Sequence, residues 1–287
     1  MTIQEILNSS VTKLEKASIG TARLDALVLL EDITGKDRAH LLAHPETPVQ
    51  GATLEKLNGW IVRRMKHEPL AYIRGKTEFY GREFLINNRV LEPRPESETM
   101  IELLKELVAS RLSLVARKTS TRESNLIITD IGTGSGALAI TAKLEMPQAE
   151  VIATDIDPNC LSVARRNAKK HHVDIAFSEG DLLNSLKLAT GDWRLATIMA
   201  NLPYVPDHYK INQAVAMEPR HAIFGGKDGL DLYRRLFGQL NRGERRVQFV
   251  FTESLPFQHK ELAKIAKQVG YSLQKTDDFI QLFTSNE

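Results

Sequence analysis

Residues 126–145 read LIITDIGTGSGALAITAKLE. The first part, LIITDI, is apolar and rich in β-branched residues, which indicates a buried strand. A glycine-rich turn follows, and GALAITAKLE then has the pattern of a helix. A glycine-rich turn between a strand and a helix is where an open α/β sheet binds its ligand. The stretch therefore predicts a fold class and the place of a ligand site within it.

The order of strand, turn and helix repeats in the residues that follow. EVIATDID at 150–157 indicates a second strand, and CLSVARRNAKKH at 160–171 indicates a second helix. Further strands are predicted before SEGDLL and at 196–200, 247–251 and 279–283, with helices at 230–240 and 260–269. Strands that alternate with helices predict a parallel sheet with helices on both faces.

The residues before this region have a different pattern. Up to about residue 65 apolar residues recur at helical spacing, and breaks at Gly20, Gly35 and His44 to Pro48 predict four or five short helices. KTEFYGREFLINNRVLEPRPE at 76–96 fits two strands joined by a turn. A helix at 99–116 and a polar loop at 118–125 are expected next. We predict a helical domain at 1–75, a β-hairpin linker at 76–95 and an α/β domain at 96–287.

Bulk composition predicts a folded soluble protein. Of its 287 residues, 42% are hydrophobic and 26% are charged. The net charge of only +2 does not produce a strong positive electrostatic field that would attract nucleic acid to the whole molecule. The single cysteine, Cys160, excludes an intrachain disulfide and a cysteine zinc cluster. The histidines show no ligand spacing, so no metal is expected. No secretory signal or membrane span is evident, so we expect a cytoplasmic location.

The spacing of the glycines narrows the class of ligand. In a dinucleotide fingerprint the third glycine comes three positions after the second, but here Gly136 follows Gly134 by two. Asp155 ends the second strand, where a carboxylate can accept hydrogen bonds from ribose hydroxyls. Asp157 is expected to cap the next helix. Asp181 is expected either near an adenine ring or as another helix cap.

A second motif, Asn201-Leu202-Pro203-Tyr204, ends a strand at the same edge of the predicted sheet. An amide nitrogen is a poor nucleophile because its lone pair is delocalised, so a reaction at that nitrogen requires two acceptors that hold its NH₂ group. The Asn201 side-chain oxygen and the Leu202 carbonyl can be those acceptors, and no general base is required before attack. Pro203 fixes the turn, and Tyr204 offers a face to a flat amide or base. The alternative interpretation is a turn with a buried tyrosine.

With these segments, the chain resembles the class I methyltransferases and, more narrowly, the release factor glutamine N5-methyltransferases. The segments that carry the resemblance are EFYGREF at 78–84, RPESE at 94–98, DIGTGSG at 130–136, NLPY at 201–204 and EPRHAIFGGKDGLD at 218–231. The resemblance implies a Rossmann-like, seven-stranded mixed sheet with a small N-terminal helical bundle and a β-hairpin connector.

The resemblance also implies an activity: transfer of a methyl group from S-adenosylmethionine to a glutamine side-chain nitrogen in the Gly-Gly-Gln loop of a peptide chain release factor, leaving S-adenosylhomocysteine. The helical domain is implied to dock the release factor. A monomer is expected, with neither stable nucleic acid nor a membrane as a partner.

Roles for individual residues follow from the same resemblance. The implied cofactor-binding residues are Asp130, Gly132, Thr133, Gly134, Gly136, Asp155, Ile156, Asp181, Leu182 and Asn201. Asp130, Gly132 and Gly134 would line the methionine end of the cofactor, Asp155 its ribose and Asp181 the surroundings of its adenine. The implied substrate-binding residues are Asn201, Leu202, Pro203 and Tyr204, of which Asn201 and Tyr204 are the catalytic pair.

One position departs from the family motif Asn-Pro-Pro-Tyr, because Leu202 replaces the first proline. The carbonyl acceptor remains, but leucine has a free φ angle and an added N–H, so looser positioning and lower activity are expected. For RPESE, the alternative interpretation is a loop that enters a helix, with Glu96 and Glu98 as favourable charges near its N-terminus.

Two other functions remain open at this point. A nucleic-acid methyltransferase acting on the exocyclic amine of adenine or guanine would use a similar grip on a flipped base, although the chain has no evident arginine-rich stripe. A non-catalytic cofactor-binding adaptor is the other alternative, against which the intact Asp155 and Asn201 argue.

Overall fold

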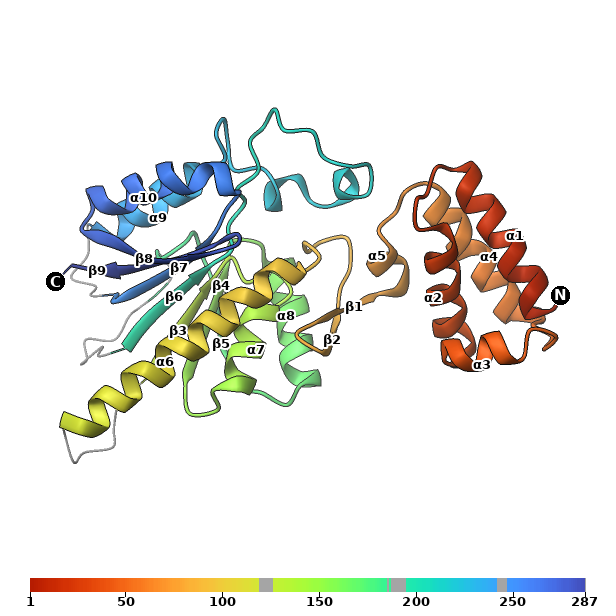
Figure 1. Ribbon diagram of the computed structural model, residues 1–287, viewed down its shortest axis with the longest axis horizontal. Coiled ribbons are helices and arrows are strands. Elements are labelled where there is room, and N and C mark those ends of the chain that lie inside the picture. Colours follow the sequence, from red (N-terminus) through yellow and green to blue (C-terminus); the bar gives the residue numbers. More distant parts are fainter. Residues whose placement is uncertain (119–125, 185, 187–194, 242–246, 287) are drawn as a thin grey trace. The chain divides into compact units, whose positions relative to one another are not determined.

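A computed structural model of the chain describes residues 1–118, 126–184, 186, 195–241 and 247–286 (Figure 1). The chain forms two compact units. One consists of Met1–Lys76 with Ile211–Glu218, and the other of Thr77–Lys210 with Pro219–Glu287. Among the helices of the described residues, none is both long enough and apolar enough to cross a membrane.

The first unit is helical, as the apolar spacing predicts. Its helices are α1 (Ile3–Lys16), α2 (Ala22–Thr34), α3 (Arg38–Ala43), α4 (Gly51–Met65) and α5 (Leu70–Arg74). A capping box starts α1: the Thr2 hydroxyl accepts from the Glu5 N–H at 3.2 Å, and the Glu5 carboxylate accepts from the Thr2 N–H at 2.9 Å. The helices bury their apolar faces in one cluster around Leu14, Leu29 and Leu30, which compensates for their short lengths.

A two-stranded hairpin follows, formed by β1 (Lys76–Phe79) and β2 (Arg82–Leu85). Gly81 takes a left-handed φ of 67° at the turn, a conformation that glycine adopts without steric cost. Phe79 and Phe84 are almost fully buried and pack edge to face with ring centroids 6.2 Å apart. Both rings belong to one of the two apolar clusters that cover the large sheet.

The second unit holds the predicted α/β fold. Its helical elements are η1 (Pro95–Ser97), α6 (Glu98–Lys118), α7 (Ala137–Glu145), α8 (Pro158–Lys170), η3 (Arg220–Ala222), α9 (Asp231–Asn241), η4 (Pro256–Gln258) and α10 (His259–Gln268). The short helix η2 (Val215–Met217) belongs to the first unit. Its strands are β3 (Leu126–Ile131), β4 (Glu150–Asp155), β5 (Ala176–Glu179), β6 (Leu195–Ala200), β7 (Phe249–Glu253), β8 (Tyr271–Asp277) and β9 (Ile280–Ser285). Except for Lys118, which ends α6, the polar loop predicted at 118–125 lies outside the described residues.

The strands form one seven-stranded sheet in the order β5-β4-β3-β6-β7-β9-β8. β9 runs antiparallel to both of its neighbours, and the other pairs are parallel. The sheet is therefore mixed, which confirms the predicted fold class. Helices α6, α7 and α8 cover one face, and α9 and α10 cover the other (Figure 1).

Alternate residues of the central strands supply the two apolar layers. Met199 and Phe251 pack in the cluster that contains α6 and α7, whereas Ile198 and Val250 pack in the cluster that contains α9 and α10. A strand buried on both faces needs apolar residues at every position, which explains why these strands read as continuous apolar runs.

The register of the sheet brings the conspicuous motifs to one edge. Ile131 at the end of β3 pairs with Thr154 of β4 on one side and with Ala200 of β6 on the other. The residues that follow these three strands therefore leave the sheet side by side. They are the glycine loop, Asp155 with its turn, and Asn201.

Asn167 links the hairpin to this edge. It is fully buried on α8, where its Oδ1 accepts from the Leu85 N–H at 2.7 Å and its Nδ2 donates to the carbonyls of Leu85 and Ser135 at 2.9 Å. Asn167→Leu keeps the volume but leaves all three backbone groups unsatisfied, so the free energy of unfolding should fall by about 2–4 kcal/mol. Urea unfolding measures the loss; the control Asn159→Leu, at an exposed position on α8, should change little, and equal stability of the two variants would contradict the link.

Candidate active site

A pocket opens at the carboxyl edge of the sheet, between the ends of β3, β4 and β6. Predicted site residues that line it are Gly132, Gly134, Asp155, Ile156, Asp181, Leu182, Asn201, Leu202 and Pro203. The rest of the lining consists of Leu91, Ile131, Cys160, Gly180, His221, Ala222, Leu232 and Arg235. Asp130, Thr133, Gly136 and Tyr204 do not line the pocket. The structure thus brings both sequence motifs into one cavity.

The glycines of the loop differ in what they do. Gly132, Gly134 and Gly136 take left-handed φ angles of 73°, 55° and 82°. A Cβ on Gly136 would lie 3.0–3.2 Å from Ile140 and Ala164, so this glycine allows α7 and α8 to pack closely. A Cβ on Gly134 would meet no atom within 4 Å, and Gly134 lines the pocket. The loop therefore offers bare backbone and open space to a ligand.

Asp155 is held rigidly at the pocket wall. Its Oδ2 accepts from the Gly134 N–H and its Oδ1 from the Asp157 N–H, both at 2.9 Å. Burial raises the pKa of Asp155, while these two backbone N–H groups oppose the rise. Each carboxylate oxygen keeps a lone pair, so a diol such as that of a ribose can donate to it. Asp157 caps α8 by accepting from the Asn159 N–H at 2.8 Å, as predicted.

Asp130 lies beneath the loop and braces it. Its Oδ2 accepts from the Thr133 hydroxyl at 2.7 Å and from the Ala139 N–H at 3.2 Å, which ties the end of β3 to the loop and to the first turn of α7. The carboxyl group is 1% exposed, and burial raises its pKa to about 7. Thr133 is also buried. Both residues support the pocket from behind.

Asp130 contributes to the pH dependence of folding. Its folded-state pKa lies above the unfolded value of about 3.9, so its contribution to stability is complete below pH 4 and is lost as the pH rises toward 7. Asp130→Asn removes this titration. Between pH 5 and pH 7.5 the free energy of unfolding of the wild type should therefore fall by about 2–3 kcal/mol relative to that of the variant. Urea unfolding of the ligand-free proteins at the two pH values measures the difference, and parallel pH profiles would contradict the prediction.

Asp181 also lines the pocket and forms an ion pair with Arg235 of α9. The described residues after Asp181 form a turn, so Asp181 does not cap a helix there. Leu182 takes a left-handed φ of 54°, which costs a branched residue about 1–2 kcal/mol. The strained turn holds Asp181 and Leu182 as neighbours in the pocket wall.

Asn201 has a defined orientation at the pocket wall. Its Nδ2 donates to the Ser97 hydroxyl and to the Glu253 Oε2, both at 2.9 Å. Both N–H bonds of the side chain are therefore used, and no group of the described residues donates to its Oδ1. This oxygen is an acceptor at the wall of the same pocket that holds the glycine loop and Asp155.

Two other residues of the motif, Leu202 and Tyr204, are fixed by different contacts. The N–H of Leu202, which a proline would lack, donates to the Tyr233 hydroxyl at 3.3 Å, and the Leu202 side chain packs against Gly132. The Tyr204 hydroxyl donates to the Glu253 Oε1 at 2.9 Å. Burial and the negative charge of Glu253 raise the pKa of Tyr204, so the phenol stays protonated and cannot serve as a base.

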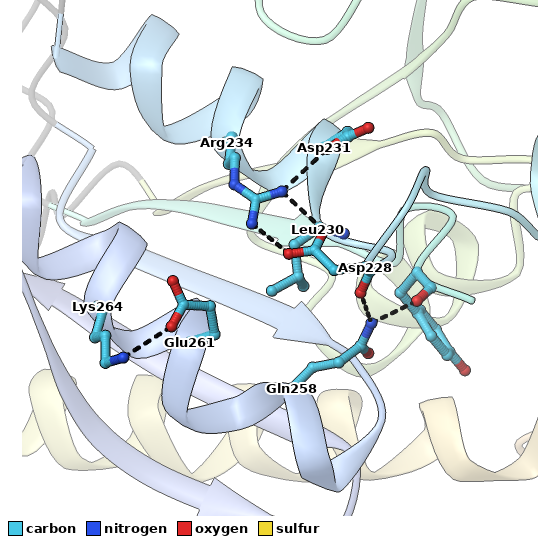
Figure 2. A network of polar contacts seen from close by, with 8 residues as sticks. Asp228, Leu230, Asp231, Arg234, Gln258, Glu261 and Lys264 are labelled. Atoms are coloured by element: carbon cyan, nitrogen blue, oxygen red, sulfur yellow. Dashed lines mark hydrogen bonds and ion pairs between the residues drawn. The ribbon is translucent and has the colours of Figure 1, made fainter. Parts of the chain in front are cut away.

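The segment 225–231, called the strap below, packs against the backbone of the motif at Tyr204. Gln258 donates from its Nε2 to the carbonyls of Tyr204 and Asp228, both at 2.7 Å (Figure 2). A Cβ on Gly229 would lie 1.9 Å from the Tyr204 carbonyl oxygen, so only glycine permits this approach. Arg234 on α9 pairs with Asp228 and Asp231 and secures the other end of the strap (Figure 2).

Sequence reasoning missed the residues that support the motif, namely Ser97, Tyr233, Glu253 and Gln258, and it missed Arg235, which pairs with Asp181. A signal existed for Glu253, because it ends a buried strand at the same edge as Asp155 and Asn201. In RPESE, Glu98 does start α6, but it also accepts from the Tyr80 N–H at 2.7 Å, and Ser97 donates to Glu253.

Cys160 is buried, which raises its pKa to about 12 and makes the thiol unreactive. The described residues include no cluster of side chains suited to a metal.

Comparisons with known proteins show the family to which the chain is similar. The family model for the PrmC N-terminal domain matches residues 5–75, and a methyltransferase domain model matches residues 128–217. The release factor glutamine methyltransferase of Koribacter versatilis is 35% identical over 84% of this chain and 81% of its own length. That of Coxiella burnetii is 37% identical over 73% and 70%.

Two further similarities have a narrower meaning. The bifunctional methyltransferase of Rickettsia prowazekii is 35% identical over 94% of this chain, which spans about half (54%) of that protein. The hMettl16 catalytic domain, solved in complex with the MAT2A 3'UTR hairpin 6, has a TM-score of 0.53 at 14% identity over 82% of each chain, which shows a shared fold. The chain shares 35–37% identity with release factor glutamine methyltransferases, and its N-terminal residues match the PrmC N-terminal domain. The chain therefore belongs to the release factor glutamine methyltransferase family.

Proposed function

We propose that this protein transfers a methyl group from S-adenosylmethionine to the side-chain nitrogen of the glutamine in the Gly-Gly-Gln loop of a peptide chain release factor. The observation that carries the proposal is the orientation of Asn201. Its N–H groups are committed to Ser97 and Glu253, so its Oδ1 is the atom available to a ligand in the pocket. An acceptor is the group that an incoming NH₂ requires.

The chain's own residues do most of the work by positioning. S-adenosylmethionine supplies an electrophilic methyl group on sulfur and becomes S-adenosylhomocysteine. Asn201 Oδ1 and the Leu202 carbonyl hold the two hydrogens of the glutamine amide, which turns the nitrogen lone pair toward the methyl group and stabilises the positive charge that develops on nitrogen. The nitrogen then releases one proton. Tyr204 stays protonated and does not take that proton, so we assign its release to the solvent.

The bare backbone at Gly134 and the carboxylate of Asp155 fit the donor molecule. Gly134 leaves open space in the pocket that a Cβ would fill, and Asp155 offers acceptors for ribose hydroxyls. We assign recognition of the adenine to Asp181 and the Leu182 backbone, because both residues line the same pocket. Gly132, with Asp130 and Thr133 behind it, would hold the methionine end.

The remaining assignments concern the rest of the chain. We assign release-factor docking to residues 1–75, of which residues 5–75 match the PrmC N-terminal domain, and methyl transfer to residues 96–287, with residues 76–95 as a connector. Translation termination takes place in the cytoplasm, so the enzyme would act there. It would act as a monomer, without stable nucleic acid or a membrane.

The test uses methyl-labelled S-adenosylmethionine and a release factor from the same source. A second copy of the release factor carries alanine in place of the Gly-Gly-Gln glutamine, and total RNA and DNA from the same source form a third arm. Label on the wild-type factor and none on the alanine copy is the expected result. Equal label on both copies, or label on nucleic acid alone, would overturn the proposal in favour of another protein site or a nucleic-acid methyltransferase.

A further inference from the structure

Glu253 ends β7, beside the end of β6, and lies directly behind the substrate motif. It is 1% exposed and does not line the pocket. Its Oε2 accepts from the Ser97 hydroxyl at 2.6 Å and from the Asn201 Nδ2 at 2.9 Å, and its Oε1 accepts from the Tyr204 hydroxyl at 2.9 Å. A carboxylate in the core is costly unless hydrogen-bond donors surround it, so this arrangement calls for a purpose beyond packing.

The carboxylate determines which way round the Asn201 amide lies. The side-chain groups hydrogen-bonded to its two oxygens, the Ser97 and Tyr204 hydroxyls and the Asn201 NH₂, all donate to Glu253, so the carboxylate faces the NH₂ end of the amide. In the opposite orientation the Asn201 oxygen would lie against the Glu253 carboxylate, and the NH₂ group would face the pocket. A substrate NH₂ would then meet donors instead of an acceptor, and the grip on the amide would be lost.

We propose that Glu253 is the positioning residue that fixes Asn201 with its Oδ1 toward the substrate amide and anchors Tyr204 through its hydroxyl. This inference rests on the proposed function for its kinetic consequences, but the orientation itself does not depend on the substrate. Ser97 completes the arrangement: it donates to Glu253 and accepts from Asn201, so all three side chains constrain one another. Burial raises the pKa of Glu253, and the hydrogen bonds from Ser97, Tyr204 and Asn201 oppose that rise.

An exchange of the two functional groups provides a sharp test. In Asn201→Asp alone, a second carboxylate faces Glu253. In the double variant Asn201→Asp with Glu253→Gln, the glutamine NH₂ donates to the new aspartate, the glutamine oxygen still accepts from Tyr204, and the second oxygen of that aspartate faces the pocket. The exchanged network relieves the contact between two carboxylates, satisfies every group and keeps an acceptor facing the pocket. The control is Glu261→Gln, the same chemical change at the exposed Glu261–Lys264 pair of α10 (Figure 2).

Methylation of the release factor is measured for all variants, together with S-adenosylhomocysteine affinity and unfolding temperature. We expect kcat to fall about 100-fold in Asn201→Asp and to recover about 10-fold in the double variant. Affinity for S-adenosylhomocysteine should stay within about 2-fold of wild type, and Glu261→Gln should behave like wild type. A double variant that is folded, binds S-adenosylhomocysteine and is no more active than Asn201→Asp would overturn the inference.

A spectroscopic measurement separates this inference from the proposed function. The side-chain NH₂ resonances of Asn201, assigned by their loss in Asn201→Asp, should shift when Glu253 is replaced by methionine and stay unchanged in Glu261→Gln. Unshifted resonances in a folded Glu253→Met variant would overturn the positioning role. If the wild type labels no release factor but the resonances shift as expected, the proposed function fails and the positioning role of Glu253 stands.

Discussion

Asn201→Ala is expected to lower the rate of glutamine methylation about 100- to 1000-fold while leaving the binding of S-adenosylmethionine nearly intact. The variant removes the acceptor that holds one hydrogen of the substrate amide, and an interaction that stabilises charge in the transition state has an effect of this size. It also removes the hydrogen bonds that Asn201 donates to Ser97 and Glu253, so these two side chains are less firmly positioned. The variant leaves Gly134 and Asp155 unchanged, to which we assign the cofactor, because Gly134 lies in the loop after β3 and Asp155 ends β4.

The measurement is single-turnover methylation of a release factor beside calorimetric titration with S-adenosylhomocysteine. Asn159→Ala is the control, because Asn159 is an exposed asparagine on α8 that does not line the pocket. If Asn201→Ala lost cofactor affinity and rate in parallel, Asn201 would be part of the cofactor site alone. A rate within about 5-fold of wild type would remove the amide grip from the mechanism.

The central part of the fold follows from the sequence because the buried parallel strands are continuous apolar runs. LIITDI and the run at 196–200 each correspond to a strand, β3 and β6. The predicted strands do not include β8. Its burial pattern shows Tyr271 buried and most of the following residues exposed, because it is an edge strand held by pairing with β9. An edge strand needs a partner more than an apolar pattern, so its own residues give little signal.

The residues of the site also differ in how well the sequence predicts them. Residues that line the pocket follow strand ends and glycine turns, where local sequence is informative, and Asp155 and Asn201 can be identified in this way. Residues that hold them come from remote segments: Ser97 lies 156 positions from its partner Glu253, and Tyr233 lies 31 positions from Leu202. Such contacts depend on the register of the whole sheet, which no single stretch of sequence specifies.

Leu202 is a case in which the structure changes the interpretation of a departure from the family motif. Its free N–H and φ angle imply loose positioning. In the structure that N–H donates to Tyr233, whose hydroxyl also donates to the Glu253 carbonyl at 2.5 Å. The side chain is 3% exposed and packs on Gly132. These contacts replace the stiffness of a proline with a hydrogen bond and buried contact area, so the carbonyl that would accept from the substrate remains fixed.

Asp155→Asn is expected to weaken the binding of S-adenosylhomocysteine about 100-fold or more. Each Asp155 oxygen now accepts from a backbone N–H, at Gly134 and at Asp157. An asparagine must turn its NH₂ toward one of these donors, which breaks that contact and displaces either the glycine loop or the start of α8. It also loses the charge that strengthens hydrogen bonds from ribose hydroxyls, each worth about 1.5–3 kcal/mol when the acceptor is ionised.

Asp157→Asn is the matched control, because it makes the same change two positions away. Asparagine caps helices as well as aspartate does, and Asp157 does not line the pocket, so α8 should keep its start and affinity should change less than about 3-fold. Calorimetric titration of both variants with S-adenosylhomocysteine decides the matter. Equal losses in the two variants would mean that affinity depends on negative charge near α8 in general. A loss confined to Asp155→Asn locates ribose recognition at the end of β4, where the register of the sheet brings Asp155 beside the loop that must carry the rest of the cofactor.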